Sequence, residues 1–542
     1  MTSDRLLLLG LDGATWTTLD PMRRRGLMPC LDALLARSAH GTLRSTIPPM
    51  TSAAWTTMMT GCGPAKHGVF DHRYFDIGAN RMRVNHAGRV RVPTIWQLLS
   101  DAGRTVVSLN VPVTYPPPKV KGLVVAGIDA PHLDAALSTN PEFARRLKAE
   151  APAYHIRTIW KRPPRDLAEM TANADATTAL CLSRATAARI ADEMFPDWSA
   201  LMVQFQNLDP FQHRAWRYLD VDETAIDDPA MTAAAGEVFR GLDRAIGELC
   251  ELAERRGAGV MVMSDHGFGP CRGRIHVNRI LTDAGLATLP GALARLRRRG
   301  RQLLDHTRTF LAKRSDPEAR SATFEHSIRA QFPLNWWKTL AFAPHQDTAA
   351  MIYLNSTQRS RGAPLETPRQ VDDARKATAA VLAAARHPET GVALFPEVID
   401  VAEAYGVDPA RENYPDLVAL PEENHWVRCK LGPGTAWIEP DDDLHGTHRP
   451  EGIVAMSGPG IAPGRTLQAH LNDVMPSILK WFRMAIPGHV EGVPLPCLDA
   501  LPTVRQDGSS SISAPHGPAF EHHSEEDQRL IEERLRELGY LG

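Results

Sequence analysis

The sequence predicts an α/β fold: a doubly wound, mostly parallel sheet with helices on both faces and an inserted cap region. Short apolar runs of the kind that form buried strands recur along the 542-residue chain. Helical patterns lie between these runs, and strand alternating with helix is typical of a parallel sheet. The hydrophobic content of 43% is sufficient for a large core.

The predicted strands are, in order, residues 5–11, 105–112, 122–127, 200–208, 259–263 and 452–457. Each is a nearly continuous apolar run, as expected for a strand covered on both faces. The clearest helix spans residues 231–256, where apolar residues recur at steps of three and four. Gly257 and Gly259 follow it and predict its end.

Residues 285–360 break this alternation and are predicted to form an insertion or cap. We therefore expect the catalytic core in two parts, residues 1–284 and 361–499. Arginines cluster at 295–301 within the insertion. They would either attract an anionic substrate or form a solvated helix face.

The end of the sequence predicts a linker over residues 500–522 and a helix over 523–542. Ser524 and Asp527 suit the start of that helix. An apolar stripe follows, and Gly539 is predicted to end it; the stripe consists of Leu530, Ile531, Leu535 and Leu538.

Charge and cysteine content exclude several classes of protein. The net charge of −2 gives no bias toward nucleic acid or acidic membranes. The seven cysteines are widely spaced and form no CxxC pair, which indicates reduced thiols and argues against a Cys-ligated zinc site. No signal peptide or membrane span is evident. We expect a cytoplasmic location, and the oligomeric state stays open.

Three acidic residues follow three of the predicted strands: Asp12, Asp209 and Asp265. The carboxyl ends of parallel strands meet at one edge of a sheet, so these side chains are expected to converge there. His213 lies four residues after Asp209, and His266 follows Asp265; both pairs suit metal ligation. Taken singly, these residues could equally form a surface ion pair, a polar turn or a helix cap.

Thr51 opens the stretch TSAAWTTMMTG after two prolines, where a helix is predicted to begin. A helix N-terminus presents positive potential that suits a phosphate group. The simpler alternative is that Thr51 or Ser52 only caps the helix. Further along, His445 and His448 in HGTHRPEG are both possible metal ligands.

Five stretches occur together in a characteristic order: LLLLGLDGATW, IPPMTSAAWTTMMTGCGPAKHGVFDH, QNLDPFQH, VMSDHGFG and GTHRPEGIV. On these the chain resembles the alkaline phosphatase superfamily. Within it, the chain is most similar to the type I phosphodiesterase/nucleotide pyrophosphatase family and its predicted bacterial phosphohydrolase relatives. The resemblance covers roughly residues 5–485, is weakest over 280–430, and implies an alkaline-phosphatase-like fold.

The resemblance implies two divalent metal ions, expected to be Zn²⁺ with Mn²⁺ as the alternative. One ion would be held by Asp12, Asp265, His266 and Thr51, and the other by Asp209, His213 and His448. Thr51 takes the place of the family's nucleophile, which forms a covalent phospho-enzyme that water then hydrolyses. His448 is preferred to His445 because it stands in the family's G-[ST]-H run, and His67 matches a structural HG pair.

At two places the sequence departs from related families, and both departures narrow the range of possible substrates. The nucleotide pyrophosphatases carry an asparagine that contacts phosphate 21 residues after the nucleophile, and here that position is His72. We expect His72 to contact substrate, in a pocket that differs from theirs. The Cys-x-Pro-x-Arg run of the sulfatases is absent, which argues against sulfate hydrolysis.

The predicted activity is therefore metal-dependent hydrolysis of a small phosphodiester or pyrophosphate, with no specific nucleic-acid binding. A phosphotransferase or a phosphomonoesterase could use the same site, so both stay open as alternatives. A non-catalytic phosphate-binding module would require a broken ligand set, whereas every expected ligand and the nucleophile are present.

Overall fold

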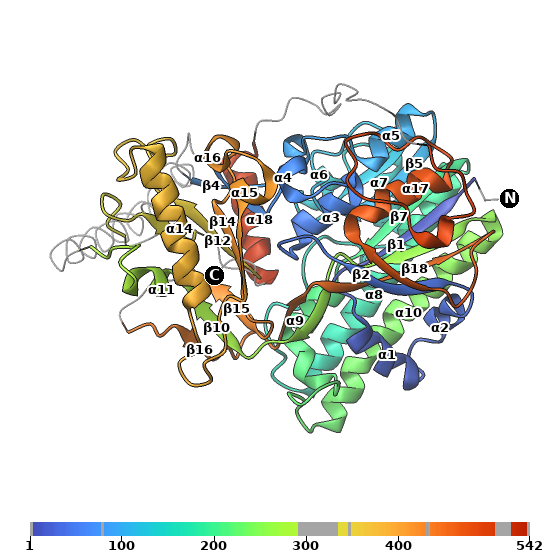
Figure 1. Cartoon of the computed structure of the whole chain (residues 1–542). Coiled ribbons are helices and arrows are strands. Elements are labelled where there is room, and N and C mark those ends of the chain that lie inside the picture. Colours follow the sequence, from blue (N-terminus) through green and yellow to red (C-terminus); the bar gives the residue numbers. More distant parts are fainter. Residues whose placement is uncertain are drawn as a thin grey trace, which may run out of the picture.

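The computed structural model describes residues 4–76, 81–290, 334–344, 348–429, 431, 434–504 and 522–538. Figure 1 shows a larger lobe around a central sheet and a smaller lobe around helix α14. The Arg cluster at 295–301 lies outside the described residues, as do most of the predicted linker and Gly539. In the part of the chain that is described, no helix combines the length and apolarity needed to cross a membrane.

The central sheet has eight strands in the order β19-β2-β18-β8-β1-β7-β5-β6. Strand β18 runs antiparallel to both of its neighbours, and the other pairs are parallel. This confirms the predicted mostly parallel α/β sheet, and each of the six predicted strands is present. In sequence order the strands are β1 (Leu6–Leu11), β2 (Ala39–Arg44), β5 (Thr105–Val111), β6 (Gly122–Ala126), β7 (Trp198–Phe205), β8 (Gly259–Met263), β18 (Glu451–Ser457) and β19 (Thr466–His470).

Helices cover both faces of this sheet, as the sequence predicts. Leu7 and Leu9 of β1 face one apolar cluster, and Leu6 and Leu8 face the other, because successive strand residues point to opposite sides. Fully burying one such leucine contributes about 1.5–3 kcal/mol. The first face is covered by α1 (Trp16–Arg24), α2 (Pro29–Leu35), α7 (Pro141–Glu150), α8 (Leu167–Met194) and α10 (Pro229–Arg256), and the second by α3 (Thr51–Thr60), α5 (Ile95–Asp101) and α17 (Val474–Trp481).

Helix α10 contains the predicted helix at 231–256. Asp228 caps it by accepting a hydrogen bond from the Met231 amide, and Gly257 ends it in the left-handed region at φ 61°. Shorter elements complete the larger lobe: α4 (Pro64–His67), η1 (Ala87–Arg89), α6 (Leu133–Ala136), α9 (Leu208–Ala215), η2 (Trp216–Tyr218), β9 (Gly267–Pro270), β17 (Gly446–Arg449), η4 (Leu471–Asp473) and η5 (Pro496–Leu498). The hairpin of β3 (Arg73–Asp76) and β4 (Arg81–Val84) packs on the smaller lobe.

The smaller lobe is built on two further sheets. One has the order β11-β12-β14-β13 and is antiparallel, and the other has the order β15-β10-β16. Residues 361–428 of the predicted second part of the core therefore lie in this lobe, and β18 returns the chain to the central sheet. The elements are β10 (Gly273–His276), α11 (Val277–Asp283), β11 (Ala341–Phe342), β12 (Ala350–Leu354), α14 (Pro368–Ala384), β13 (Glu397–Asp400), α15 (Val401–Tyr405), α16 (Pro409–Glu412), β14 (Leu417–Leu420), β15 (His425–Arg428) and β16 (Ile438–Glu439).

The last described helix, α18 (Glu525–Leu538), lies where the two lobes meet (Figure 1). Ser524 accepts a hydrogen bond from the amide of Asp527 at 3.1 Å, as its predicted capping role requires. Ile531, Leu535 and Leu538 of the predicted stripe are buried. Since they recur every three or four residues, they form one apolar face of the helix.

Candidate metal centre

The three predicted acids meet at one edge of the central sheet. Asp12 follows β1, Asp265 follows β8, and Asp209 lies in α9 just after β7. Strands β7, β1 and β8 are neighbours and parallel, so their carboxyl ends lie side by side. Nε2 of His266 is 3.7 Å from Asp12 Oδ1 and 3.9 Å from Asp209 Oδ1, so the three acids surround one imidazole.

Asp12, Asp265 and His266 form the first of two groups whose ligand atoms all lie within 4.8 Å of one another. Oδ2 of Asp12 accepts hydrogen bonds from Trp55 Nε1 at 3.0 Å and Gln204 Nε2 at 2.7 Å. Oδ1 of Asp265 accepts from the amide of Gly13 at 3.1 Å. The other oxygens, Asp12 Oδ1 and Asp265 Oδ2, are buried and have no hydrogen-bond partner among the described residues.

Gly10 makes the contact between Trp55 and Asp12 possible. A Cβ atom at position 10 would lie 2.5 Å from the indole ring of Trp55, closer than side-chain atoms approach each other. Because glycine has no Cβ, helix α3 can pack closely against β1 and direct the indole N–H at Asp12.

Asp209, His213 and His448 form the second group. Helix α9 carries Asp209 and His213 four residues apart, on one face. His448 comes from β17, which pairs with β9 and places His448 opposite Phe268. Nε2 of His448 is 2.9 Å from Asp209 Oδ1. The ring of His448 also stacks on that of His266 with centroids 3.6 Å apart, so the two groups adjoin.

Each imidazole of the two groups is oriented by a backbone carbonyl. Nδ1 of His213, His266 and His448 lies 2.8, 3.1 and 2.9 Å from the carbonyl oxygens of Gly446, Gly267 and Pro49. Carbonyl oxygen only accepts, so Nδ1 carries the proton and Nε2 presents a lone pair. This is how histidine ligands of metals are usually held.

The two groups fit divalent cations. Nε2 of His213 and Nε2 of His448 lie 3.1 Å apart, where two lone pairs repel unless a cation or a proton lies between them. The two carboxylate oxygens that lack hydrogen-bond partners face His266 Nε2 in the same way. Nitrogen and oxygen donors in this combination are typical ligands of zinc and other transition metals.

Burial and mutual repulsion control the protonation of the acids. The pKa of Asp12 is raised well above its ordinary value by burial and by the nearby carboxylates of Asp265 and Asp209. Burial likewise raises the pKa of Asp265. The pKa of Asp209 shifts in the opposite direction: burial works against its ionised form, but the protonated forms of His213 and His448 bring its pKa well below the ordinary value.

Thr51 is the first residue of α3, and the capping position before it is Met50. The alternative in which Thr51 or Ser52 serves only as the helix cap is therefore wrong. Oγ1 of Thr51 lies 3.4 Å from His266 Nε2, at the rim of the first group. Oγ of Ser52 lies 2.6 Å from Nδ1 of His72, so the position that departs from the nucleotide pyrophosphatases sits next to the predicted nucleophile.

The other two sequence candidates lie apart from the ligand atoms. His445 belongs to neither group; its ring faces Tyr218 with centroids 6.0 Å apart. His67 is fully buried between Thr57 and Val69, hydrogen bonded to both. This is the structural role predicted for it.

Three residues that contact the ligands were absent from the sequence predictions: Trp55, Gln204 and Trp426. Gln204 could have been noticed in the sequence, since it is a polar residue within an apolar strand. Trp55 follows Thr51 by one helical turn, which hints at a shared face. Trp426 left no signal, because it comes from the smaller lobe and reaches His213 only in the folded chain.

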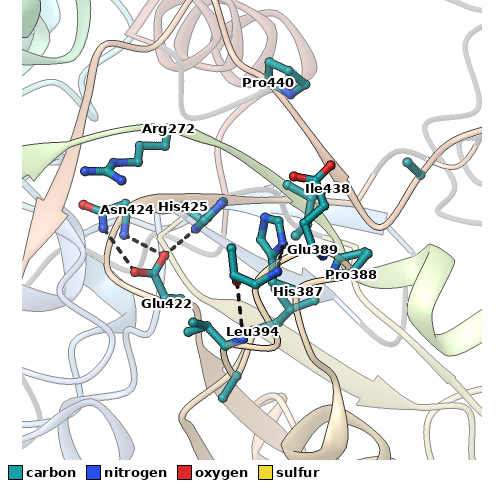
Figure 2. A pocket seen from close by; sticks show the side chains of 14 residues that line it. Arg272, His387, Pro388, Glu389, Leu394, Glu422, Asn424, His425, Ile438 and Pro440 are labelled. Carbon is teal, nitrogen blue, oxygen red and sulfur yellow. Dashed lines mark hydrogen bonds and ion pairs between the residues drawn. The ribbon is translucent and has the colours of Figure 1, made fainter. Parts of the chain in front are cut away.

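A surface pocket of about 540 Å³ lies on the smaller lobe (Figure 2). Its wall includes Glu422, which accepts hydrogen bonds from the side chains of His425 and Asn424. None of the six ligand residues lines it. His425 and Trp426 are successive residues of β15 and point to opposite sides, so the strand separates this pocket from the metal centre.

Fold and site together define a class: an α/β metallohydrolase with paired Asp/His groups at the carboxyl ends of parallel strands. The model of the type I phosphodiesterase / nucleotide pyrophosphatase family matches residues 6–451. The chain belongs to this family, and it is thus a metal-dependent phosphoester hydrolase of the alkaline phosphatase superfamily.

Two solved structures illustrate the similarity. Phosphonoacetate hydrolase from Sinorhizobium meliloti 1021 is 16% identical, with 87% of this chain and 94% of that chain covered and a TM-score of 0.49. Murine ectonucleotide pyrophosphatase / phosphodiesterase 5 is 14% identical, with 89% and 95% covered and a TM-score of 0.47. No curated protein matches the chain.

Proposed function

We propose that this protein cleaves small phosphodiesters or pyrophosphates through a covalent phosphothreonine at Thr51. The observation that carries the proposal is the position of the Thr51 hydroxyl, 3.4 Å from His266 Nε2 beside two Asp/His groups. In this proposal Asp12, Asp265, His266 and Thr51 hold one divalent cation, and Asp209, His213 and His448 hold the other. Mixed nitrogen and oxygen ligands favour Zn²⁺, with Mn²⁺ as the alternative.

When bound, two cations supply positive charge to both oxygens of an in-line displacement at phosphorus. Thr51 gives its proton to solvent, and its oxygen forms the new bond to phosphorus as the bond from phosphorus to the ester oxygen breaks. The departing oxygen takes up a proton from solvent. Water then cleaves the phosphothreonine and restores the hydroxyl. The product that keeps the phosphorus is a phosphomonoester if the substrate was a diester.

Helix α3 contributes to this step through its N-terminus. The first amides of a helix have no carbonyl partner within the helix and point outward, toward the position of a phosphate bonded to Thr51. The helix dipole adds positive potential there and stabilises an alkoxide relative to the alcohol. Because Thr51 is the first helical residue, its oxygen lies where both effects are strongest.

His72 is proposed to contact the substrate phosphate. If the Ser52 hydroxyl donates to Nδ1 of His72, the other ring nitrogen carries the proton and is a hydrogen-bond donor. Burial lowers the pKa of His72 to about 4, so the ring is neutral at pH 7. A neutral N–H in this position can donate a hydrogen bond to a phosphate oxygen of either a diester or a pyrophosphate, and it adds no full positive charge to the site.

The first test compares Thr51→Ala with Thr60→Ala in protein loaded with Zn²⁺. Both threonines are buried in α3, but Thr60 bonds back to the carbonyl of Thr56 and lies at the far end of the helix. Hydrolysis of bis-p-nitrophenyl phosphate is expected to fall by at least about 10³-fold in Thr51→Ala and to persist in Thr60→Ala. Full activity of Thr51→Ala would show that another group is the nucleophile.

Metal content and product analysis complete this test. Thr51→Ala should still bind two Zn²⁺, because the Asp and His ligands remain. A faster rate on p-nitrophenyl phosphate than on the diester would instead indicate a phosphomonoesterase. Phosphoryl transfer to added alcohols in place of water would indicate a phosphotransferase.

A cytoplasmic location is part of the proposal. It is supported by the seven cysteines, which are all free thiols. Cell fractionation with an antibody against the protein would test it, and recovery outside the cytoplasmic fraction would contradict it.

A further inference from the structure

The indole of Trp426 packs against two imidazoles of the second group. Its ring centroid lies 5.3 Å from that of His213 and 6.0 Å from that of His448, and its plane is nearly perpendicular to both. Trp426 is completely buried, and its indole nitrogen has no hydrogen-bond partner among the described residues. Its contribution is therefore its shape and position, not a hydrogen bond.

Helix α18 packs behind this indole. Trp426 belongs to one apolar cluster with Ile531, Leu535 and Leu538, the buried face of α18. Leu444 is in the same cluster, and it precedes strand β17, which carries His448. The helix therefore shares one apolar cluster with the indole and with the segment that leads to the ligand His448.

Polar contacts fix α18 in this place. The buried Arg534 donates to the backbone carbonyls of Ile128 and Ala130 at 2.6 and 2.5 Å, and to that of Pro131 at 2.8 Å. Gln528 donates to the carbonyl of Met82 at 2.9 Å. These acceptors lie after β6 of the central sheet and on the β3–β4 hairpin, so polar contacts tie α18 to two separate segments of the chain.

We propose that Trp426 is a positioning residue of the second group and that α18 holds it there. The inference rests on the proposed function, because it assigns a role toward the cation held by Asp209, His213 and His448. The carbonyl of Gly446 fixes one edge of the His213 ring, and the indole of Trp426 limits its rotation. Without α18, the space filled by Ile531 and Leu535 opens and the indole can turn away from the imidazoles.

The experiment measures the two Zn²⁺ dissociation constants of the full chain by competition with a chromophoric chelator. Trp426→Ala removes the indole, and Leu535→Ala removes part of its backing without touching the ligands. Trp426→Phe keeps an aromatic ring at this position but removes the five-membered ring of the indole with its unused N–H. Leu382→Ala is the matched control, since Leu382 of α14 is equally buried but lies in another cluster of the smaller lobe.

Loss of a group that orients metal ligands typically weakens metal binding about 10–100-fold. We expect this loss for one of the two ions in Trp426→Ala and Leu535→Ala, and wild-type constants in Trp426→Phe and Leu382→Ala. The visible absorption spectrum of bound Co²⁺ should change in Trp426→Ala and be restored in Trp426→Phe, which a purely structural role would not produce.

Two results would overturn the inference: wild-type constants in both Trp426→Ala and Leu535→Ala, or an equal loss in Leu382→Ala. The thermal unfolding midpoint of each metal-free variant shows whether the fold is retained. Binding of fewer than two Zn²⁺ by the wild-type chain is a different result. It would refute the proposed function itself, and with it this inference.

Discussion

The two Asp/His groups differ in what holds them in place. Asp12 and Asp265 follow neighbouring strands of the central sheet, and their hydrogen-bond donors belong to the same lobe. His213 and His448 stand on a short helix and a two-stranded ribbon outside that sheet, beside Trp426 of the smaller lobe. The first group is thus fixed by the core, and the second depends on contact between lobes.

Because of this difference, we expect the first group to be the more rigid half of the centre and the second group the more adjustable half. The first group adjoins the proposed nucleophile, whose position relative to phosphorus has to be exact for in-line attack. The second group would face the leaving oxygen, which varies with the substrate.

Removing a ligand from either group should give the largest effect. Asp265→Asn and Asp209→Asn each weaken one cation site, and several kcal/mol of transition-state stabilisation corresponds to a loss of about 10³-fold in kcat/KM. Zn²⁺ titration of the two variants assigns each dissociation constant to its group. If either substitution weakens the binding of both ions equally, the two groups are not separate sites and the comparison is wrong.

Gln204→Met should give a smaller effect, confined to the first group. Gln204 donates to Asp12 Oδ2 at 2.7 Å, and its Oε1 accepts from the side-chain Nδ2 of Asn110 at 2.6 Å. Methionine has similar length but cannot donate, so Zn²⁺ affinity of the first group should fall about tenfold. The Zn²⁺ affinity of the second group should be unaffected. In Trp426→Ala the opposite is expected, since there the second group loses affinity. A loss at the second group alone would contradict the proposed division.

The smallest effect concerns helix α3, which carries Thr51. Burial lowers the pKa of His67 to about 3, against about 6.5 in the unfolded chain. The unfolded chain therefore binds the proton more tightly, and the stability from neutral His67 is complete above pH 6.5 and is lost as the pH falls toward 3.

Between pH 6.5 and 5.5 this loss amounts to about 1 kcal/mol. His67→Gln should remove that part of the pH dependence from the free energy of unfolding, measured by urea denaturation of the metal-free protein. The same pH slope in both proteins would show that His67 does not titrate in this way.

The sequence predicted six of the eight strands in the central sheet of the larger lobe. Strands covered on both faces leave continuous apolar runs, so β1, β5, β6, β7, β8 and β18 were predicted. The sequences of β2 (AHGTLR) and β19 (TLQAH) are short and mixed, because these strands lie at or next to the sheet edge and are partly exposed. Their periodicity carries little information, and they were missed.

For the candidate site, the ligand residues could be predicted from the sequence, but the residues that contact them could not. Each ligand candidate stood next to an apolar run or within a family stretch, and the structure brings Asp12, Asp209 and Asp265 to one sheet edge. The supports of those ligands were not predictable. Trp426 and Leu535 are ordinary apolar residues in sequence, and their relation to His213 depends on contacts across more than one lobe.

Helix α18 also has a consequence for the order of events during synthesis. All six ligand residues precede it in the chain, and its anchors on Ile128 and Ala130 lie 406 and 404 residues upstream. A nascent chain can therefore gather the ligands while the indole behind them is still uncovered. An intermediate in which α18 has not yet docked would hold its second cation loosely, so full metal loading would follow the docking of this helix.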